Sequence, residues 1–296
     1  MRWKAICAAS LLALLTTLAA AQNQEQYLDV FITKVKPEKR ADFDAVAKKV
    51  AAANRQNKGD TWLAMETTYG EGNTVSFVSV RQSYGDIEKA TDAFMGALGK
   101  VYGQAGTQKL FQDLNACVIS SQNEVRRRRF DLSSNVPGDA AAMAKLVGEA
   151  RWLRSTVVHV RPGQVLNFEA MLKDVKAASE KADPPQTNLV SQAVAGQHGT
   201  VFYITALRSS LGDFDHTPAL PQLMGEEAYR NFLKQAVDVV SSTETVINHF
   251  LPELSNPPEN IASAAPDFWN PKPPTAAAKA KPKAGAAKAD DKAKQP

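Results

Sequence analysis

The chain has 296 residues, of which 44% are hydrophobic and 22% are charged. This balance is typical of a globular protein, it excludes a fibrous or wholly disordered chain, and the length suffices for two domains. The net charge of +4 comes from the two ends of the chain. Residues 22–270 are therefore slightly acidic, which argues against a nucleic-acid-binding face.

The N-terminus has the pattern of a secretory signal. Arg2 and Lys4 precede an uncharged apolar run over 5–18, which is followed by three alanines ending at Ala21. Such a run is short for a membrane span, although an uncleaved anchor is the alternative. We expect a signal peptide over 1–21, a periplasmic or secreted protein, and no transmembrane span after cleavage.

Two cysteines are present. Cys7 leaves with the signal peptide, so Cys117 stands alone and no internal disulfide is expected. Cys117 follows an apolar helical pattern, which favours a buried small hydrophobe over a reactive thiol, since no basic residue is adjacent to lower its pKa.

The first half of the chain alternates strand and helix patterns. Apolar residues with a period of two predict strands. Pro37 can open a helix, and Phe43, Val46 and Val50 lie at helical spacing on its predicted buried face. The predicted elements are a strand at 27–35, a helix from 37 toward Gly59, a hairpin of strands at 61–69 and 74–81, a helical stretch at 86–121 interrupted near Gly103 and Gly106, and a strand at 124–132.

The second half repeats this order, β-α-β-β-α-β, which is the split-βαβ or ferredoxin-like pattern. A short linking helix, with Asp139 as its candidate N-cap, precedes it. The predicted elements are the linking helix at 140–150, a strand at 153–160, a helix at 165–181, a hairpin of strands at 188–195 and 200–207, a helix at 226–241 and a strand at 245–251.

Internal repetition supports two diverged copies of one unit. Segments 35–43 and 160–168 share a valine, a basic residue, a proline and a phenylalanine at matching positions. Segments 73–77 and 198–202 match at the same separation along the chain. The predicted domains are a first ferredoxin-like repeat at 22–135, a linker helix at 136–151, a second ferredoxin-like repeat at 152–256 and a Pro/Ala/Lys-rich disordered tail at 257–296.

Several predicted strands are apolar on both faces, so each sheet needs cover on both sides. Val30 and Ile32 oppose Phe31 and Val35 on the first strand. A duplicated β-α-β-β-α-β pattern with two-sided strands resembles the dimeric α+β barrel superfamily, which includes antibiotic-biosynthesis-type monooxygenases, NIPSNAP-like and EthD-like proteins. The resemblance covers roughly 27–256 and rests on topology. It implies an α+β fold in which two ferredoxin-like repeats pack as a pseudo-dimeric barrel.

The tail has almost no large apolar residues to bury, so it cannot offset the entropy of ordering. We expect disorder after Trp269, with Phe268 and Trp269 docked on the body. Its lysines suit contact with an anionic envelope surface. A solvated spacer without a partner is the alternative.

No P-loop, dinucleotide-binding glycine motif, zinc-protease motif or nucleophile elbow occurs. His159 and His249 fall on predicted neighbouring strands of the second repeat, where they could act as acid and base or share a metal. Two ordinary strand histidines are the alternative. No residue identifies an axial haem ligand, so neither a cofactor nor a metal is expected.

Arg126, Arg127, Arg128 and Arg129 form an unusual basic run on the last predicted strand of the first repeat. Alternation puts two guanidiniums on each face, and the inward pair would suit a carboxylate or phosphate. Protection of a sheet edge by charge is the alternative.

The absence of a catalytic motif favours a non-catalytic, exported module that binds a small apolar or anionic ligand or associates with the envelope. The candidate ligand-binding residues are the four arginines with His159 and His249. The resemblance implies the alternative, a cofactor-free or haem-linked monooxygenase-like oxidoreductase. Either a monomer or a homodimer is compatible with a fused pair.

Overall fold

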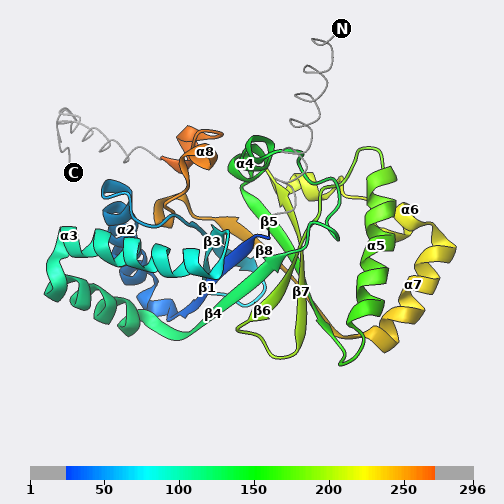
Figure 1. The fold of residues 1–296 in the computed structure, drawn as a ribbon, viewed down its shortest axis with the longest axis horizontal. Coiled ribbons are helices and arrows are strands. Elements are labelled where there is room, and N and C mark those ends of the chain that lie inside the picture. Colours follow the sequence, from blue (N-terminus) through cyan, green and yellow to red (C-terminus); the bar gives the residue numbers. More distant parts are fainter. Residues whose placement is uncertain (1–24, 271–296) are drawn as a thin grey trace, which may run out of the picture.

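The computed structural model describes residues 25–270, and Figure 1 shows their arrangement. The predicted signal peptide and the tail beyond Asn270 lie outside the described residues. The strands are β1 (Tyr27–Val35), β2 (Leu63–Tyr69), β3 (Thr74–Arg81), β4 (Val118–Arg128), β5 (Trp152–Val160), β6 (Leu189–Ala195), β7 (Thr200–Arg208) and β8 (Val240–Phe250). The helices are α2 (Arg40–Gln56), α3 (Tyr84–Cys117), α4 (Ala140–Glu149), α5 (Val165–Lys181), α6 (Leu220–Met224), α7 (Glu226–Val239), α8 (Glu259–Ala262) and α9 (Pro266–Trp269), with 3-10 turns η1 (Pro37–Lys39), η2 (Gly212–Phe214) and η3 (Pro252–Leu254).

The eight strands close into one antiparallel barrel in the order β1-β3-β2-β8-β5-β7-β6-β4. Within each half, the last strand lies beside the first, as in a ferredoxin-like sheet. The long strands β4 and β8 each pair with two neighbours and join the halves, through β4 with β6 and β8 with β2. The predicted α+β class and a closed barrel are therefore present.

Two helix ends differ from the prediction. The helix predicted at 86–121 ends at Cys117, and the strand predicted at 124–132 starts at Val118. In the second half the helix likewise ends at Val239, and β8 starts at Val240. In both places β-branched residues begin the strand, and their stiff side chains favour extended backbone over another helical turn.

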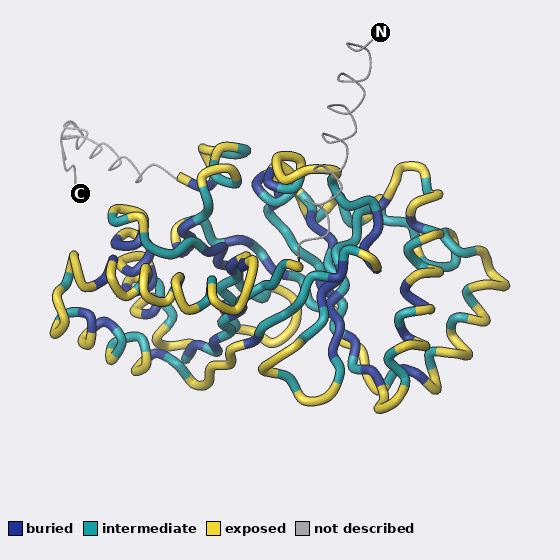
Figure 2. Tube along the Cα trace, in the orientation of Figure 1, coloured by how far each residue is buried: buried dark blue, intermediate teal, exposed yellow. Residues whose placement is uncertain are grey.

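Helices cover the outer face of each half of the barrel. Helices α2 and α3 lie on the first half, and α5, α6 and α7 lie on the second (Figure 1). Buried residues run along the strands and the inner sides of these helices (Figure 2). Helix α3 bends at Gly103, where φ is 65° and ψ is 179°, so the predicted interruption near this glycine is present.

One end of the barrel is closed by α4, α8 and α9. The Trp269 side chain is 0% exposed, and its ring packs edge-on against Phe250. Its Nε1 donates a 2.8 Å hydrogen bond to the carbonyl of Gly148. A Cβ at Gly148 would lie 2.5 Å from the carbonyl oxygen of Ile261, so glycine permits the close approach of α8 to α4. Helices α8 and α9 lie inside the range that we assigned to the tail.

No helix in the described part of the chain combines the length and the hydropathy that crossing a membrane requires. The polypeptide between 25 and 270 is thus organised around the barrel, with its inner face, its two helix-covered outer faces and its two ends as the places where a site can form.

Candidate functional site

The pairing register shows which side chains face the barrel interior. Residues opposite each other on paired strands share a face. On β1, Val30 pairs with Glu124 of β4, while Phe31 stacks against Phe77 on the helix-covered side. Because successive residues alternate, Glu124 points into the barrel. The inward residues of β4 are Gln122, Glu124, Arg126 and Arg128.

Glu124 is the centre of a buried polar cluster, which we call the Glu124 cluster: Gln122, Glu124, Arg126, Gln197 and Tyr203. The Glu124 side chain is only 1% exposed. Its Oε2 accepts from Arg126 Nε at 2.7 Å and from the Tyr203 hydroxyl at 2.7 Å. Its Oε1 accepts from Gln197 Nε2 at 2.6 Å and from Gln122 Nε2 at 3.1 Å.

Electrostatics hold this carboxylate in place. Arg126 forms an ion pair with Glu124 and lies 3.5 Å from the centre of the Tyr203 ring. Burial and the nearby Glu124 charge raise the pKa of Tyr203, although Arg126 opposes them. The phenol therefore stays protonated and donates its hydrogen bond to the carboxylate. A buried charge is tolerated when it is paired and its acceptor sites are filled, as they are here.

The loop between β6 and β7 covers one side of the cluster. Gly196 has φ of 86°, and a Cβ there would lie 2.0 Å from the carbonyl oxygen of Asn123. Gln122 Nε2 donates to the Gly196 carbonyl at 2.7 Å, which ties the loop to β4. The loop thereby presents Gln197 to the Glu124 carboxylate. Gln122 itself is exposed, so the cluster lies just beneath the surface.

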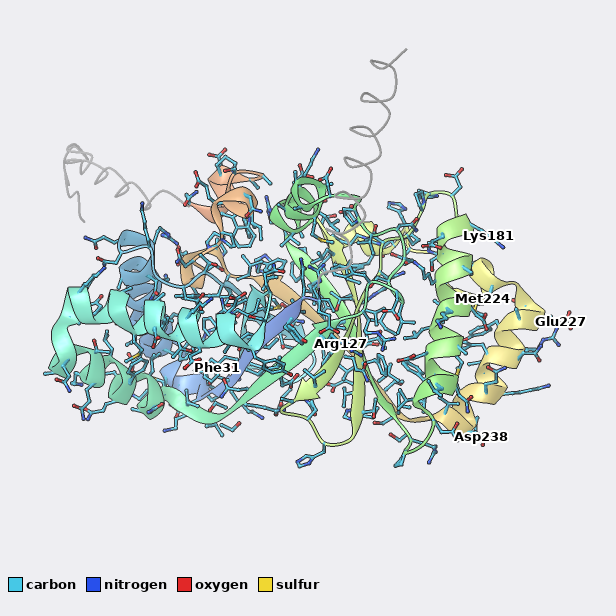
Figure 3. The ribbon with its side chains drawn as sticks, in the orientation of Figure 1. Phe31, Arg127, Lys181, Met224, Glu227 and Asp238 are labelled. Atoms are coloured by element: carbon cyan, nitrogen blue, oxygen red, sulfur yellow. The ribbon has the colours of Figure 1, made fainter. Side chains whose placement is uncertain are left out.

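The arginine run divides between the two faces of the barrel wall. Arg126 and Arg128 point inward, and Arg127 and Arg129 point outward; Figure 3 labels Arg127. The strand is no edge, because β4 pairs with both β1 and β6, so the edge-protection alternative does not apply.

The inward arginines differ in their partners. Arg126 is paired with Glu124, whereas Arg128 donates to Gln26 Oε1 at 2.8 Å and lies 4.5 Å from the centre of the Phe130 ring. Among residues 25–270 no carboxylate forms an ion pair with Arg128. Burial lowers the pKa of Arg128 to about 10. We predicted that two inward arginines would suit an anionic ligand. Because Arg126 is already paired with Glu124, only Arg128 has no carboxylate partner among the described residues.

The outward arginines are held by other partners. Arg129 contacts the carboxylates of Asp131 and Glu169, and these hydrogen bonds raise its pKa despite burial. Arg127 lies 3.6 Å from Glu25, and its Nε is buried without a hydrogen-bond partner.

The structure does not bring His159 and His249 together. Strands β5 and β8 are neighbours, as predicted, but His159 pairs with Ser242 while His249 pairs with Trp152. Seven residues separate Trp152 from His159, so the histidines lie about 23 Å apart along the strand and on opposite faces. The rings of His249 and Trp152 are tilted against each other with their centres 4.5 Å apart, and burial lowers the pKa of His249.

The described residues contain no group of three or more His, Cys, Asp or Glu side chains that could hold a metal ion. Haem needs an axial ligand and room for its ring. The helix–sheet layer of the second half is filled by Phe168, Met171 and Phe202, each no more than 3% exposed, and its core contains no histidine. His198 and His216 are exposed in loops. The residues present therefore do not fit haem in this layer.

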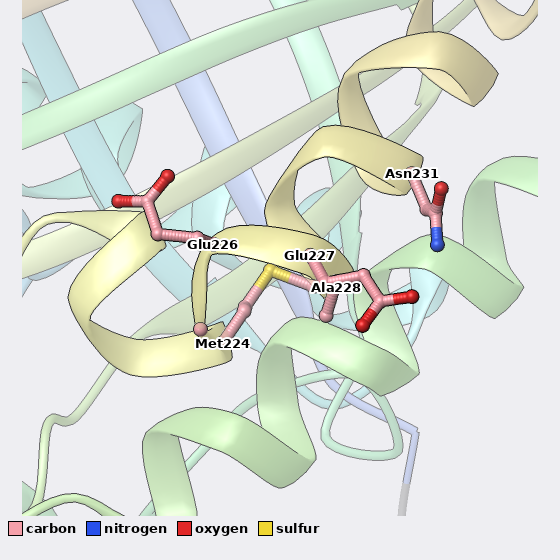
Figure 4. Close-up of a pocket in the computed structure, with 6 residues that line it drawn as sticks. Met224, Glu226, Glu227, Ala228 and Asn231 are labelled. Atoms are coloured by element: carbon pink, nitrogen blue, oxygen red, sulfur yellow. The ribbon is translucent and has the colours of Figure 1, made fainter.

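A surface hollow lies apart from the Glu124 cluster, at the junction of α6 and α7. Its volume is about 450 Å³, and Met224, Gly225 and Asn231 are among its lining residues. Figure 4 shows the carboxylates of Glu226 and Glu227 directed away from each other, so these two groups do not converge on one ligand.

Comparisons with known proteins show similarity only in structure. No family model matches the chain, and no curated protein matches it. An anthrone oxidase-like protein superposes with a TM-score of 0.47 at 14% identity, covering 78% of this chain and 93% of that protein. A monooxygenase-like protein from Lactobacillus acidophilus NCFM gives 0.46 at 10% identity, covering 76% and 93%. The chlorite dismutase from Candidatus Nitrospira defluvii gives 0.44 at 10% identity, covering 81% and 94%.

These similar structures correct one expectation. We expected a non-catalytic ligand-binding or envelope-associated module, but the neighbours are oxidase-like, monooxygenase-like and chlorite dismutase proteins. The absence of a sequence motif misled the prediction, because function in such folds depends on side chains that only the folded register assembles.

Sequence reasoning missed both Glu124 and Tyr203. Glu124 was placed at the start of a predicted strand, and neither residue was among the candidates for the site. The sequence did offer one signal. Glu124 is the single acid of β4, and Arg126 follows two residues later on the same face of the strand.

Proposed function

We propose that the protein is an oxidoreductase of the monooxygenase type that needs no haem, and that the Glu124 cluster is its reaction centre. The observation that supports this is a carboxylate inside the barrel that is 1% exposed and is held by a guanidinium and a phenol. A carboxylate positioned by fixed partners can act as a general base.

In the proposed reaction Glu124 accepts a proton from an activated CH₂ group of a small, largely apolar substrate. Arg126 forms an ion pair with the carboxylate, and the Tyr203 hydroxyl orients it. The substrate carbanion then gives electrons to O₂ and bonds to it; protonation gives a hydroperoxide, which loses water. The balance is R₂CH₂ + O₂ → R₂C=O + H₂O, with four electrons passing from carbon to oxygen and no external reductant.

Substrate access requires displacement of a hydrogen bond. Gln197 Nε2 occupies Glu124 Oε1 at 2.6 Å, and it belongs to a loop rather than to a strand. A substrate entering beside the loop would take the place of Gln197. No step is assigned to haem, since the helix–sheet layer of the second half is filled by buried side chains and its core contains no histidine.

The test is O₂ consumption with anthrone as the probe substrate, followed by electrode and by product absorption. We expect turnover by the wild type and a loss of at least about a hundredfold for Glu124→Gln, the usual range for removing a general base. Glu71→Gln, which removes an exposed carboxylate, is the matched control. Equal rates for wild type and Glu124→Gln, with both folded by circular dichroism, would refute the proposal.

We further propose that the two halves are diverged copies of one unit, related to the NIPSNAP-like and EthD-like branches of the superfamily. The shared motif at 35–43 and 160–168 supports this. Cutting the chain within 136–151 and coexpressing the halves should restore a soluble complex. Two halves that aggregate without associating would count against it.

Export is likewise a proposal, supported by the charged start, the apolar run and the small residues before Gln22. Mass spectrometry of the mature protein from the periplasmic fraction should give an N-terminus at Gln22. An intact Met1 in that fraction would exclude cleavage.

A further inference from the structure

Two arginines without carboxylate partners lie on the helix-covered face of the second half. Arg154 of β5 pairs with Ala206 of β7, and Arg208 lies two residues further along β7. Earlier in β7, Phe202 lies on the same face as Arg208 and contacts Phe168 of α5. The two guanidiniums therefore project on the outer side of the barrel wall, opposite to the side that holds the Glu124 cluster.

Both guanidiniums contact one aromatic ring. The carbon centres of Arg154 and Arg208 lie 5.0 Å and 5.7 Å from the centre of the Phe214 ring in η2. Arg208 is oriented by Gln186 Oε1 at 3.0 Å and Thr217 Oγ1 at 3.4 Å. Within residues 25–270, Arg154 makes no hydrogen bond and no ion pair, so its planar set of N–H donors is available.

Asp213, the acid whose charge acts on Arg208, forms no ion pair with either arginine. Asp213 Oδ2 accepts from Ser209 Oγ at 2.6 Å and from the Ser210 backbone at 2.9 Å, which directs it to its own loop. Burial lowers the pKa of Arg154. Burial together with the Arg154 charge lowers the pKa of Arg208, although the Asp213 charge opposes them. Two like charges held together in a partly buried place disfavour each other unless an anion lies between them.

We propose that Arg154 and Arg208 form a binding site for the oxyanion of a small ligand, a carboxylate or a phosphate. Guanidinium forks match both groups in geometry and charge. Trp152 pairs with Arg208 on the same face and contacts the His249 ring, so it adds an aromatic surface beside the charges. A ligand that carries a ring and an anionic group fits this combination.

The probes are inorganic phosphate and benzoate, titrated into the whole protein by calorimetry and by thermal shift at low ionic strength. We expect saturable binding of at least one probe, about tenfold weaker in Arg154→Gln and in Arg208→Gln, as for the loss of one charge-assisted hydrogen bond. Tighter benzoate binding assigns an aryl carboxylate, and tighter phosphate binding assigns a phosphate. The matched control is Arg161→Gln with Arg230→Gln, which removes the same charge from exposed positions of the same half.

Binding that is equal in wild type and in the double variant Arg154→Gln with Arg208→Gln would overturn the proposal, as would no binding of either probe to the wild type. A second readout separates the ligand role from a structural one. Without ligand, Arg154→Gln should leave the melting temperature unchanged or raise it, because an unpaired, partly buried charge is removed. A clear decrease would mean that the contact with Phe214 is structural.

Discussion

The Tyr203 hydroxyl of β7 donates a 2.7 Å hydrogen bond to Glu124 Oε2 of β4, across the intervening strand β6. The same oxygen accepts from Arg126, whose guanidinium lies over the Tyr203 ring. Each of the three side chains thus contacts the other two. Removing any one takes a hydrogen bond or an ion pair from the buried groups that remain, so the cluster should be stabilising.

Tyr203→Phe removes one hydrogen bond to the carboxylate and keeps the ring beneath Arg126. We expect the free energy of unfolding to fall by about 1–2 kcal/mol, since the carboxylate keeps its other donors. Urea unfolding measures this. Tyr27→Phe is the control, because that hydroxyl contacts Glu25 at the surface and its loss should change little. An equal effect of both substitutions would contradict the account of the buried cluster.

The sequence predicted the fold more fully than the site. Periodicity located the strands and helices because packing on both faces of the barrel leaves a strong apolar pattern, as at Val30 and Phe31. It did not reveal the polar cluster, because Glu124 and Tyr203 are 79 residues apart and meet only through the order of β4, β6 and β7. No local spacing encodes that approach.

The two histidines show a second limit. Adjacent strands were predicted correctly, but adjacency alone does not bring two residues together. His159 and His249 both lie near the C-terminal ends of their strands, and antiparallel pairing puts these ends at opposite sides of the barrel. The two histidines are therefore far apart because β5 and β8 are antiparallel, although the strands are neighbours.

The Trp269 side chain should be a major contributor to stability. It is 0% exposed, packs against Phe250 and donates to the Gly148 carbonyl. Trp269→Ala should lower the free energy of unfolding by about 3–5 kcal/mol, the range for truncating a buried aromatic residue. Leu166→Ala, at a side chain that is 79% exposed, is the control. Chemical denaturation of the full chain compares them, and a loss below about 1 kcal/mol for Trp269→Ala would contradict the docked position of α9.

The two glycines of the β6–β7 loop should respond differently to alanine. Both have positive φ, 86° at Gly196 and 72° at Gly199. A Cβ at Gly196 would meet the Asn123 carbonyl oxygen at 2.0 Å, whereas at Gly199 it would meet nothing within 4 Å. Gly199→Ala should therefore lower the free energy of unfolding by roughly 1 kcal/mol, because only the unfavourable positive φ of alanine opposes it. Gly196→Ala adds a steric clash and should lower it by roughly 2 kcal/mol or more. Thermal unfolding of the pair measures the difference, and equal effects would show that the loop does not rest on β4.

His249 should make stability depend on pH near neutrality. Burial lowers its pKa below the ordinary value of 6.5, Arg151 acts in the same direction, and Glu66 opposes them. The unfolded chain therefore binds the proton more readily than the folded one. The contribution of His249 to the free energy of unfolding is fully present above pH 6.5. It decreases as the pH falls from 6.5 toward the lowered pKa of His249 in the folded protein. His249→Gln should flatten this decrease, whereas His216→Gln, at an exposed loop position, should not. Unfolding measured between pH 8 and pH 5 tests the assignment, and an unchanged profile for His249→Gln would place the titration elsewhere.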